Sequence, residues 1–85
     1  MKSVVSRFIK IAKENPQAVA VTRLIGDVWE SATYEQVRIE AECFAQLLLR
    51  TGVLPGDAVV IPSLRSPDLV SKLLGILWIG GHYVF

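Results

Sequence analysis

The residue types in this sequence that could do covalent chemistry are one cysteine, Cys43, and one histidine, His82. Such a pair can form a nucleophilic centre when the histidine activates the sulfur, but here the two residues stand far apart in the sequence. A zinc site needs a cluster of cysteine and histidine ligands, and a single cysteine cannot form a disulfide within the chain. We therefore interpret Cys43 as a reduced thiol beside a helical apolar face and His82 as a structural residue at a strand start.

The carboxylates and phenols offer no catalytic set either. Glu35 and Asp57 have the context of a helix-start residue and a turn residue, and no second carboxylate is placed beside either one to form an acid–base pair. Tyr34 and Tyr83 are expected to be packing aromatics with hydrogen-bonded hydroxyls. We assign no catalytic, cofactor-binding or metal-binding residue from the sequence.

The composition indicates that the chain has apolar surface to be buried by another polypeptide segment. The chain has 85 residues, of which 52% are hydrophobic, a high share for a soluble domain. A small protein has much surface for its volume, so either some apolar surface is meant for a partner or the chain belongs inside a larger fold. Trp29 and Trp78 fit both readings, since each could anchor a partner or fill the core.

The charge distribution favours neither nucleic acid nor membrane as a partner. The formal net charge is +1, which gives no electrostatic case for either. Four basic residues near the N-terminus lie opposite an apolar helical face, an arrangement also found in membrane-surface helices; we interpret it as a solvated face. No apolar run approaches the about 20 residues of a membrane span, and no secretory signal is evident, so we expect a cytoplasmic protein.

The N-terminal part is predicted to form a helix and a β-hairpin. Apolar residues recur at helical spacing over residues 4–12, and Asn15-Pro16 ends that helix because a residue before proline avoids helical geometry. Strands are expected at residues 18–22 and 28–31. Gly26-Asp27 provides the two-residue turn between them, with glycine supplying a positive φ.

A second helix and a buried strand follow. Thr33 and Gln36 match the capping box that starts a helix, and Gly52 is expected to stop it. Residues 55–57 form a turn, and residues 58–61 are apolar on both faces, as in a parallel strand covered on two sides. The buried face of the second helix should consist of Val37, Ala41, Phe44, Ala45 and Leu48.

The last segment is predicted to be a helix that returns to a parallel strand. Ser66 is expected to cap this helix, Pro67 to occupy its first turn, and Asp68 to meet its positive end. Gly80-Gly81 ends the helix, and residues 83–85 form the returning strand. The buried stripe should consist of Leu69, Val70, Leu73, Leu74 and Leu77.

Three short motifs stand in order along the chain: Thr33-Tyr34-Glu35, residues 52–57 with the sequence GVLPGD, and residues 80–84 with the sequence GGHYV. Together with Asn15-Pro16 and Arg65-Ser66, they resemble the N-terminal part of the adenylate-forming enzymes. That superfamily contains acyl-CoA synthetases, luciferases and the adenylation domains of nonribosomal peptide synthetases. The resemblance covers nearly the whole chain.

Within the superfamily, Arg65-Ser66 and the GGHYV motif favour the amino-acid-activating peptide synthetase domains over the acyl-CoA synthetases. The sequence also departs from the family pattern at three places. Ala32 stands where a leucine is usual, Trp78-Ile79 replaces a common Lys-Ala pair, and Phe85 replaces a proline.

The resemblance implies that residues 1–85 are one N-terminal fragment of an adenylation (AMP-binding) domain, without an internal boundary. The implied fold is α/β and partial: an N-terminal helix, a β-hairpin, then a helix and one βαβ crossover feeding a parallel sheet. The family condenses a carboxylate with ATP to an acyl-adenylate. Its phosphate-binding loop and its lysine have no counterpart here, so ATP and Mg²⁺ are expected only in a complete enzyme and the fragment alone should be inactive.

Two kinds of partner remain open at this point. The first is the complementary remainder of an adenylation domain. The second is a partner protein, or a second copy of the chain, bound by a small non-catalytic interaction module. Such a module would use an exposed strand edge at Tyr83, Val84 and Phe85, because unpaired strand edges recruit other strands.

Overall fold

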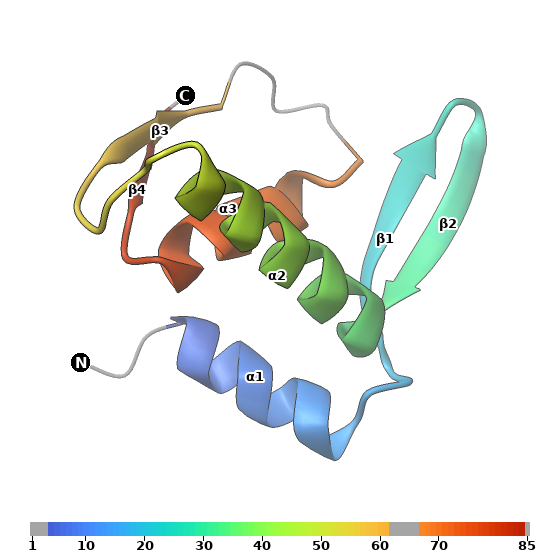
Figure 1. Ribbon diagram of the computed structural model, residues 1–85. Helices are drawn as coiled ribbons and strands as arrows, with labels where there is room; N and C mark the ends of the chain where they lie inside the picture. Colours follow the sequence, from blue (N-terminus) through green and yellow to red (C-terminus); the bar gives the residue numbers. More distant parts are fainter. Residues whose placement is uncertain (1–3, 62–66, 85) are drawn as a thin grey trace.

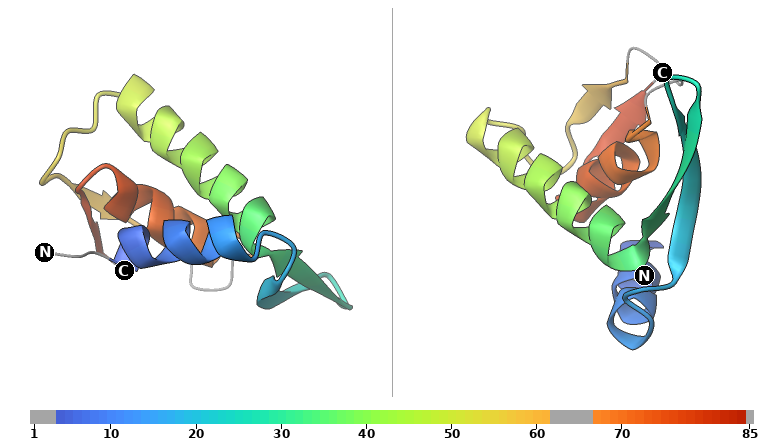
Figure 2. Two further views of the ribbon diagram at one scale, coloured as in Figure 1. Left: turned by 90° about the horizontal axis from the view of Figure 1, so that it is seen from below. Right: turned by 90° about the vertical axis from the view of Figure 1, so that its right-hand side faces the viewer.

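The helices of the computed structural model pack together, and a two-stranded sheet lies at each end of the α2–α3 pair (Figure 1). The structure describes residues 4–61 and 67–84. Figure 2 shows α1 lying across the side of α3, with the hairpin projecting beyond the helices. In chain order the elements are α1 Val4–Glu14, β1 Val19–Ile25, β2 Val28–Thr33, α2 Tyr34–Arg50, β3 Ala58–Val60, α3 Leu69–Trp78 and β4 His82–Val84.

The predicted β-hairpin is confirmed: β1 extends further toward the turn than expected, to Ile25, while β2 begins at Val28 as expected and continues further from the turn, to Thr33. β1 and β2 pair antiparallel up to Ile25 and Val28, which leaves Gly26-Asp27 as the turn. Gly26 has a φ of +61°, and no residue other than glycine has a positive φ among those described. A positive φ at the first turn position alone is the pattern of a type II′ turn, which matches the twist of the flanking strands.

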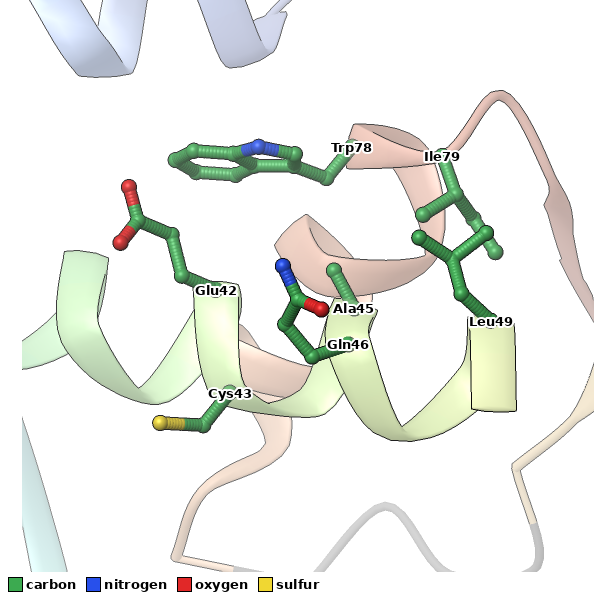
Figure 3. Close-up of a pocket in the computed structure, with 7 residues that line it drawn as sticks. All are labelled: Glu42, Cys43, Ala45, Gln46, Leu49, Trp78 and Ile79. Atoms are coloured by element: carbon green, nitrogen blue, oxygen red, sulfur yellow. The ribbon is translucent and has the colours of Figure 1, made fainter. Parts of the chain in front are cut away.

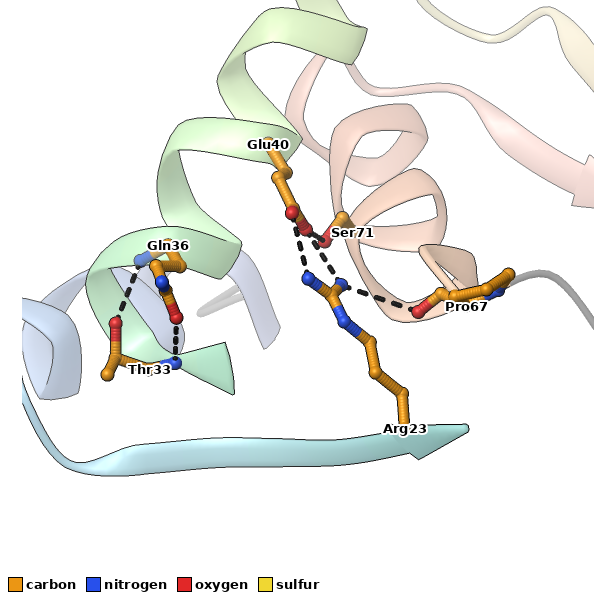
Figure 4. Close-up of polar contacts among 6 residues, drawn as sticks. All are labelled: Arg23, Thr33, Gln36, Glu40, Pro67 and Ser71. Atoms are coloured by element: carbon orange, nitrogen blue, oxygen red, sulfur yellow. Dashed lines mark hydrogen bonds and ion pairs between the residues drawn. The ribbon is translucent and has the colours of Figure 1, made fainter. Parts of the chain in front are cut away.

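The N-terminus of α2 forms the predicted capping box (Figure 4). The Gln36 amide donates to the Thr33 hydroxyl over 3.2 Å, and the Thr33 amide donates to the Gln36 side-chain oxygen over 2.8 Å. Beyond the other end, Gly52 has a φ of +93°, the left-handed geometry that closes many helices. The predicted face is confirmed: Val37, Ala41, Ala45 and Leu48 are buried, and Phe44 packs against the core beside them.

The predicted start of α3 is wrong by two residues. The helix begins at Leu69 with Asp68 at the N-cap position, and Asp68 makes no side-chain capping bond. Pro67 therefore precedes the helix instead of occupying its first turn. Its carbonyl accepts a hydrogen bond from the Arg23 guanidinium at 3.4 Å, a contact with a distant strand that local sequence rules cannot anticipate. The expected cap, Ser66, lies outside the described residues.

The buried stripe of α3 also differs from the prediction. Leu74 is buried as expected, but Val70 is exposed, and Leu69, Leu73 and Leu77 are only partly buried. The reason is that α3 lies between two apolar clusters: Leu74 packs with Val5, Val37 and Ala41 in one, and Ile76 packs with Leu48 and Ile61 in the other. The residues of α3 that are buried are Ser71, Leu74, Gly75 and Ile76.

Gly75 is the point at which α3 meets α2 most closely. A Cβ built at Gly75 would lie 2.9 Å from the carbonyl oxygen of Ala41 and 3.0 Å from the Phe44 ring. The first of these is a backbone atom inside a helix, so it cannot rotate away. The absence of a side chain at Gly75 therefore allows the two helices to pack at this distance.

We expect Gly75→Ala to destabilise the chain by about 1–3 kcal/mol, because overpacking outweighs the roughly 1 kcal/mol that alanine gains over glycine in a helix. Urea unfolding followed by circular dichroism measures the change. Val70→Ala, on the exposed side of α3, is the matched control and should cost less than about 1 kcal/mol. An increase in stability for Gly75→Ala would show that the helices are not in close contact there.

Candidate functional site

The surface best suited to a functional contact is the parallel sheet formed by β3 and β4. Its register pairs Ala58 with His82, Val59 with Tyr83, and Val60 with Val84. Backbone bonds extend the pairing at both ends: the His82 amide donates to the Asp57 carbonyl over 2.9 Å, and the Ile61 amide donates to the Val84 carbonyl over 2.7 Å. A parallel strand pair is thus formed, as predicted.

The helices cover only one face of this sheet. Val59 points toward them and packs beside the cluster of Leu48, Ile61 and Ile76. Val60 and its partner Val84 point to the other face, where the two residues are 68% and 46% exposed. Parallel sheets are normally covered on both faces, so two adjacent valines at this exposure mark a face that lacks its cover.

The residues predicted as a partner edge fall on this sheet. Tyr83 and Val84 lie in β4 and are both exposed; Phe85 lies outside the described residues. Whether they bind a partner stays a prediction. The sequence-based expectation of a strand covered on both sides is wrong for β3 in this chain, since Ala58 and Val60 are exposed.

The other singled-out residues are spread over the molecule. Cys43 is exposed on α2 and His82 is exposed on β4. Asp57 acts as the predicted turn residue, because its carboxylate accepts from the Leu54 amide at 2.8 Å. Tyr34 packs its ring against Phe8, with the ring centroids 5.6 Å apart. Of the two tryptophans, Trp78 packs beside the core and Trp29 is 68% exposed, so core burial of Trp29 is wrong.

A polar cluster that the sequence patterns did not predict links the hairpin to both central helices (Figure 4). The Arg23 guanidinium from β1 donates two hydrogen bonds of 3.0 Å to the Glu40 carboxylate of α2. The Ser71 hydroxyl of α3 donates to the same carboxylate over 2.6 Å. A bidentate pair of this kind fixes orientation as well as distance. The signal in the sequence was the polar Ser71 in an otherwise apolar helical face.

This cluster shifts the pKa values of both charged members in the stabilising direction. The hydrogen bond from Arg23 lowers the pKa of Glu40, helped by the bond from Ser71 and opposed by partial desolvation. The hydrogen bond to Glu40 likewise raises the pKa of Arg23. Because the Glu40 pKa is lowered on folding, the pair stabilises the fold above the ordinary glutamate pKa of about 4.3. That stabilisation is lost as the pH falls through the folded-state value.

Among the described residues, the side chains that could ligate a metal ion are not gathered in one place. Within residues 4–61 and 67–84, no group of three or more His, Cys, Asp or Glu side chains lies close enough together to hold a metal. The one bidentate guanidinium in Figure 4 is already occupied by Glu40. No step through ATP or Mg²⁺ is therefore assigned to these residues. In the same part of the chain, no helix has the length and apolar character needed to cross a bilayer.

Comparison with known proteins identifies the fold. The model of the AMP-binding enzyme family matches residues 8–85. The chain belongs to this family. Among its relatives, a plipastatin synthase of Bacillus subtilis is 35% identical over 83 residues, and the probable non-canonical nonribosomal peptide synthetase CymA of Salinispora arenicola is 39% identical over 77 residues. These alignments cover 98% and 91% of this chain, but only 3% and 1% of those proteins.

Solved structures of AMP-binding relatives contain the same arrangement. Klebsiella oxytoca NpsA in complex with 3-hydroxyanthranilyl-AMSN superposes with a TM-score of 0.87 at 27% identity, and the match covers 99% of this chain and 16% of NpsA. A fatty acyl-adenylate ligase of Legionella pneumophila superposes with a TM-score of 0.86 at 28% identity, over 98% of this chain and 15% of the ligase. The chain is thus an N-terminal segment of the adenylate-forming fold, as the motifs predicted.

We expect Glu40→Gln to lower the stability of the chain by about 1 kcal/mol at pH 7, a modest value because the Glu40 side chain is 38% exposed and its charge is partly screened. The difference from wild type should shrink as the pH falls through the lowered pKa of Glu40 and vanish once Glu40 is protonated. Urea unfolding at several pH values measures both effects.

Glu42→Gln is the control for this experiment, since Glu42 forms a surface pair with Arg38 along α2 and should contribute no more than about 0.5 kcal/mol. If Glu40→Gln matches wild type at pH 7, or if its deficit persists at low pH, then the Arg23–Glu40 pair does not stabilise the fold through charge.

Proposed function

We propose that this chain forms the N-terminal part of an amino-acid-activating adenylation domain, and that it works as scaffold in that domain. In the complete domain, ATP and Mg²⁺ convert a carboxylic acid to an acyl-adenylate. The chain contributes the α2–α3 helix pair and the first parallel strands, on which the rest of the sheet is built. By itself it carries out no chemistry.

The observation that carries this proposal is the bare face of the β3–β4 sheet. Val60 and Val84 present adjacent apolar side chains on the face opposite α3. Full burial of such a side chain would contribute roughly 1.5–3 kcal/mol; at 68% exposure Val60 forgoes most of that energy, and at 46% exposure Val84 forgoes nearly half of it. A polypeptide that completes the sheet and covers this face recovers that energy. Since the chain covers only 15% of the Legionella ligase, the rest of such a domain is long enough to provide that cover.

The preference for amino acids as substrates rests on sequence. The relatives named above include a nonribosomal peptide synthetase, and the Arg65-Ser66 and GGHYV motifs favour the same branch. The structural neighbours include a fatty acyl-adenylate ligase, so the backbone arrangement is shared by both branches. We place the activity in the cytoplasm, where ATP is available and where Cys43 remains a thiol.

The complementary remainder of the domain is the proposed partner. When that remainder is absent, the same strand edge at Tyr83, Val84 and Phe85 is available to a second copy of the chain, and self-association is our second partner proposal. Both contacts use one surface, so they exclude each other.

A chimera tests the proposed function directly. We expect a chimera, in which this chain replaces the matching segment of NpsA, to keep its rate of ATP–pyrophosphate exchange within about tenfold of the NpsA rate. The two backbones superpose closely, so the catalytic groups of NpsA should stay near their positions. A misplacement of those groups by about 1 Å would cost about a hundredfold. The assay uses 3-hydroxyanthranilic acid, the acyl part of the NpsA ligand. The isolated 85-residue chain should give no exchange with any amino acid.

Two results would contradict the proposal. Exchange by the isolated chain would show that it carries a catalytic site of its own. A chimera that folds, by circular dichroism and gel filtration, but lacks exchange activity would show that this segment does not support an active domain.

A charge introduced on the exposed face of the β3–β4 sheet should impair assembly of the complete domain without unfolding the isolated chain. We expect Val60→Asp to change the stability of the isolated chain by less than about 1 kcal/mol, because Val60 is 68% exposed, yet to reduce exchange by the chimera more than about tenfold. Light scattering should also show less self-association of the isolated chain.

Leu54→Asp provides the matched control, because Leu54 is 64% exposed but lies in the turn before β3 instead of on the sheet. Equal loss of exchange in the two chimeras would mean that the face around Val60 has no special role in assembly.

A further inference from the structure

A second surface of the chain has a different character from the bare sheet. An open pocket of about 650 Å³ lies between α2 and the C-terminal end of α3. Figure 3 shows the Trp78 indole forming one wall, with the Gln46 amide on the side of the ring face, the Glu42 carboxylate beyond one edge of the ring, and the Leu49 and Ile79 side chains at the other end. Trp78 also packs beside the core cluster that includes Val5 and Leu74, so the indole ring is held in place.

The chemistry of these walls selects for a planar cation. The face of an indole ring carries partial negative charge and attracts cations, most often a guanidinium. A carboxylate beside that ring can accept further hydrogen bonds from the same group. Leu49 and Ile79 offer apolar surface on which a methylene stem can lie. The Glu42 carboxylate would repel an anionic ligand. A wholly apolar ligand would remove water from that carboxylate without replacing its hydrogen bonds, which costs free energy.

We propose that this pocket binds the guanidinium group of an arginine side chain presented by another polypeptide segment. The guanidinium stacks on Trp78 and pairs with Glu42, and the Gln46 side-chain oxygen offers a further acceptor for its N–H groups. The chain itself shows that Glu42 accepts such a group, because Arg38 pairs with one oxygen of its carboxylate at 3.0 Å. A carboxylate has lone pairs for more than one such bond.

This proposal goes beyond the proposed function and stands apart from it. The pocket is lined by residues of α2 and the end of α3, whereas the bare sheet face points away from α3. The pocket can therefore be tested without any adenylation assay.

The test uses Trp78 as its own reporter. Trp29→Phe removes the other tryptophan, which is exposed, and is the background for all variants. Nα-acetyl-arginine methylamide is added as the probe and followed by fluorescence. We expect a saturable change with an apparent Kd in the millimolar range, about tenfold tighter than for the uncharged citrulline analogue and about threefold tighter than for the lysine analogue. Free arginine should bind more weakly than the blocked probe, because its own carboxylate approaches Glu42.

Variants in the charged pair make the test specific. Glu42→Gln should weaken binding about threefold, and Glu35→Gln, which removes the other carboxylate near Arg38, should leave it unchanged. Arg38→Met should tighten binding about twofold, because it leaves the Glu42 carboxylate for the probe alone. All three side chains lie on the surface of α2, so the fold is retained, and circular dichroism checks this.

The following results would overturn the proposal. Equal Kd values for the arginine and citrulline analogues would show that charge is not recognised. No change with Glu42→Gln, or weaker binding with Arg38→Met, would show that the carboxylate is not the partner. Tighter binding of free arginine than of the blocked probe would point to a small metabolite as the ligand instead of a polypeptide.

Discussion

At Gly75 the backbones of α2 and α3 approach so closely that even a methyl group would lie 2.9 Å from the Ala41 carbonyl oxygen. This contact sets the distance between the two helices, and both apolar clusters depend on that distance. Leu74, on one side of Gly75, packs against Val37 and Ala41, while Ile76, on the other side, packs against Leu48 and Ile61. A helix that contributes to two cores at once cannot shift toward one without loosening the other.

The same contact positions both sheets. Ser71 lies one helical turn before Gly75 and donates to Glu40, which in turn holds Arg23 and therefore the hairpin. Toward the other end, the Gly81 amide donates to the Ile76 carbonyl over 3.0 Å, and the next residue, His82, pairs with Asp57 and starts β4. The β3–β4 pair consequently has one face packed on the helix pair, through Val59, and one face on which Val60 and Val84 are exposed.

Local features of the fold could be predicted from the sequence, and contacts between distant segments could not. The capping box at Thr33 depends on residues three positions apart, so its pattern is complete in the sequence. The burial of Gly75 and Ser71 depends on α2, some thirty positions away in the sequence. A rule based on the spacing of apolar residues does not predict the burial of a glycine or a serine. The start of α3 was misplaced for a related reason, because the Pro67 carbonyl bonds to Arg23 on another element.

The same distinction between local features and distant contacts applies to the β3–β4 sheet. The motif around Gly80 correctly indicated a parallel strand at Tyr83 and Val84. The apolar run at residues 58–61 indicated a strand covered on both faces, but burial depends on which segments pack against the strand, and Val60 is 68% exposed.

The two surfaces of this chain meet at one short segment. Trp78 forms a wall of the pocket, Gly80 with a φ of +78° turns the backbone, and His82 begins the strand whose outer face is bare. Gly81 lies close to its neighbours, since a Cβ there would lie 3.2 Å from the Asp57 carbonyl oxygen and from the Ile76 side chain. The turn between Trp78 and β4 is therefore packed closely against both Ile76 of α3 and the backbone at Asp57 before β3.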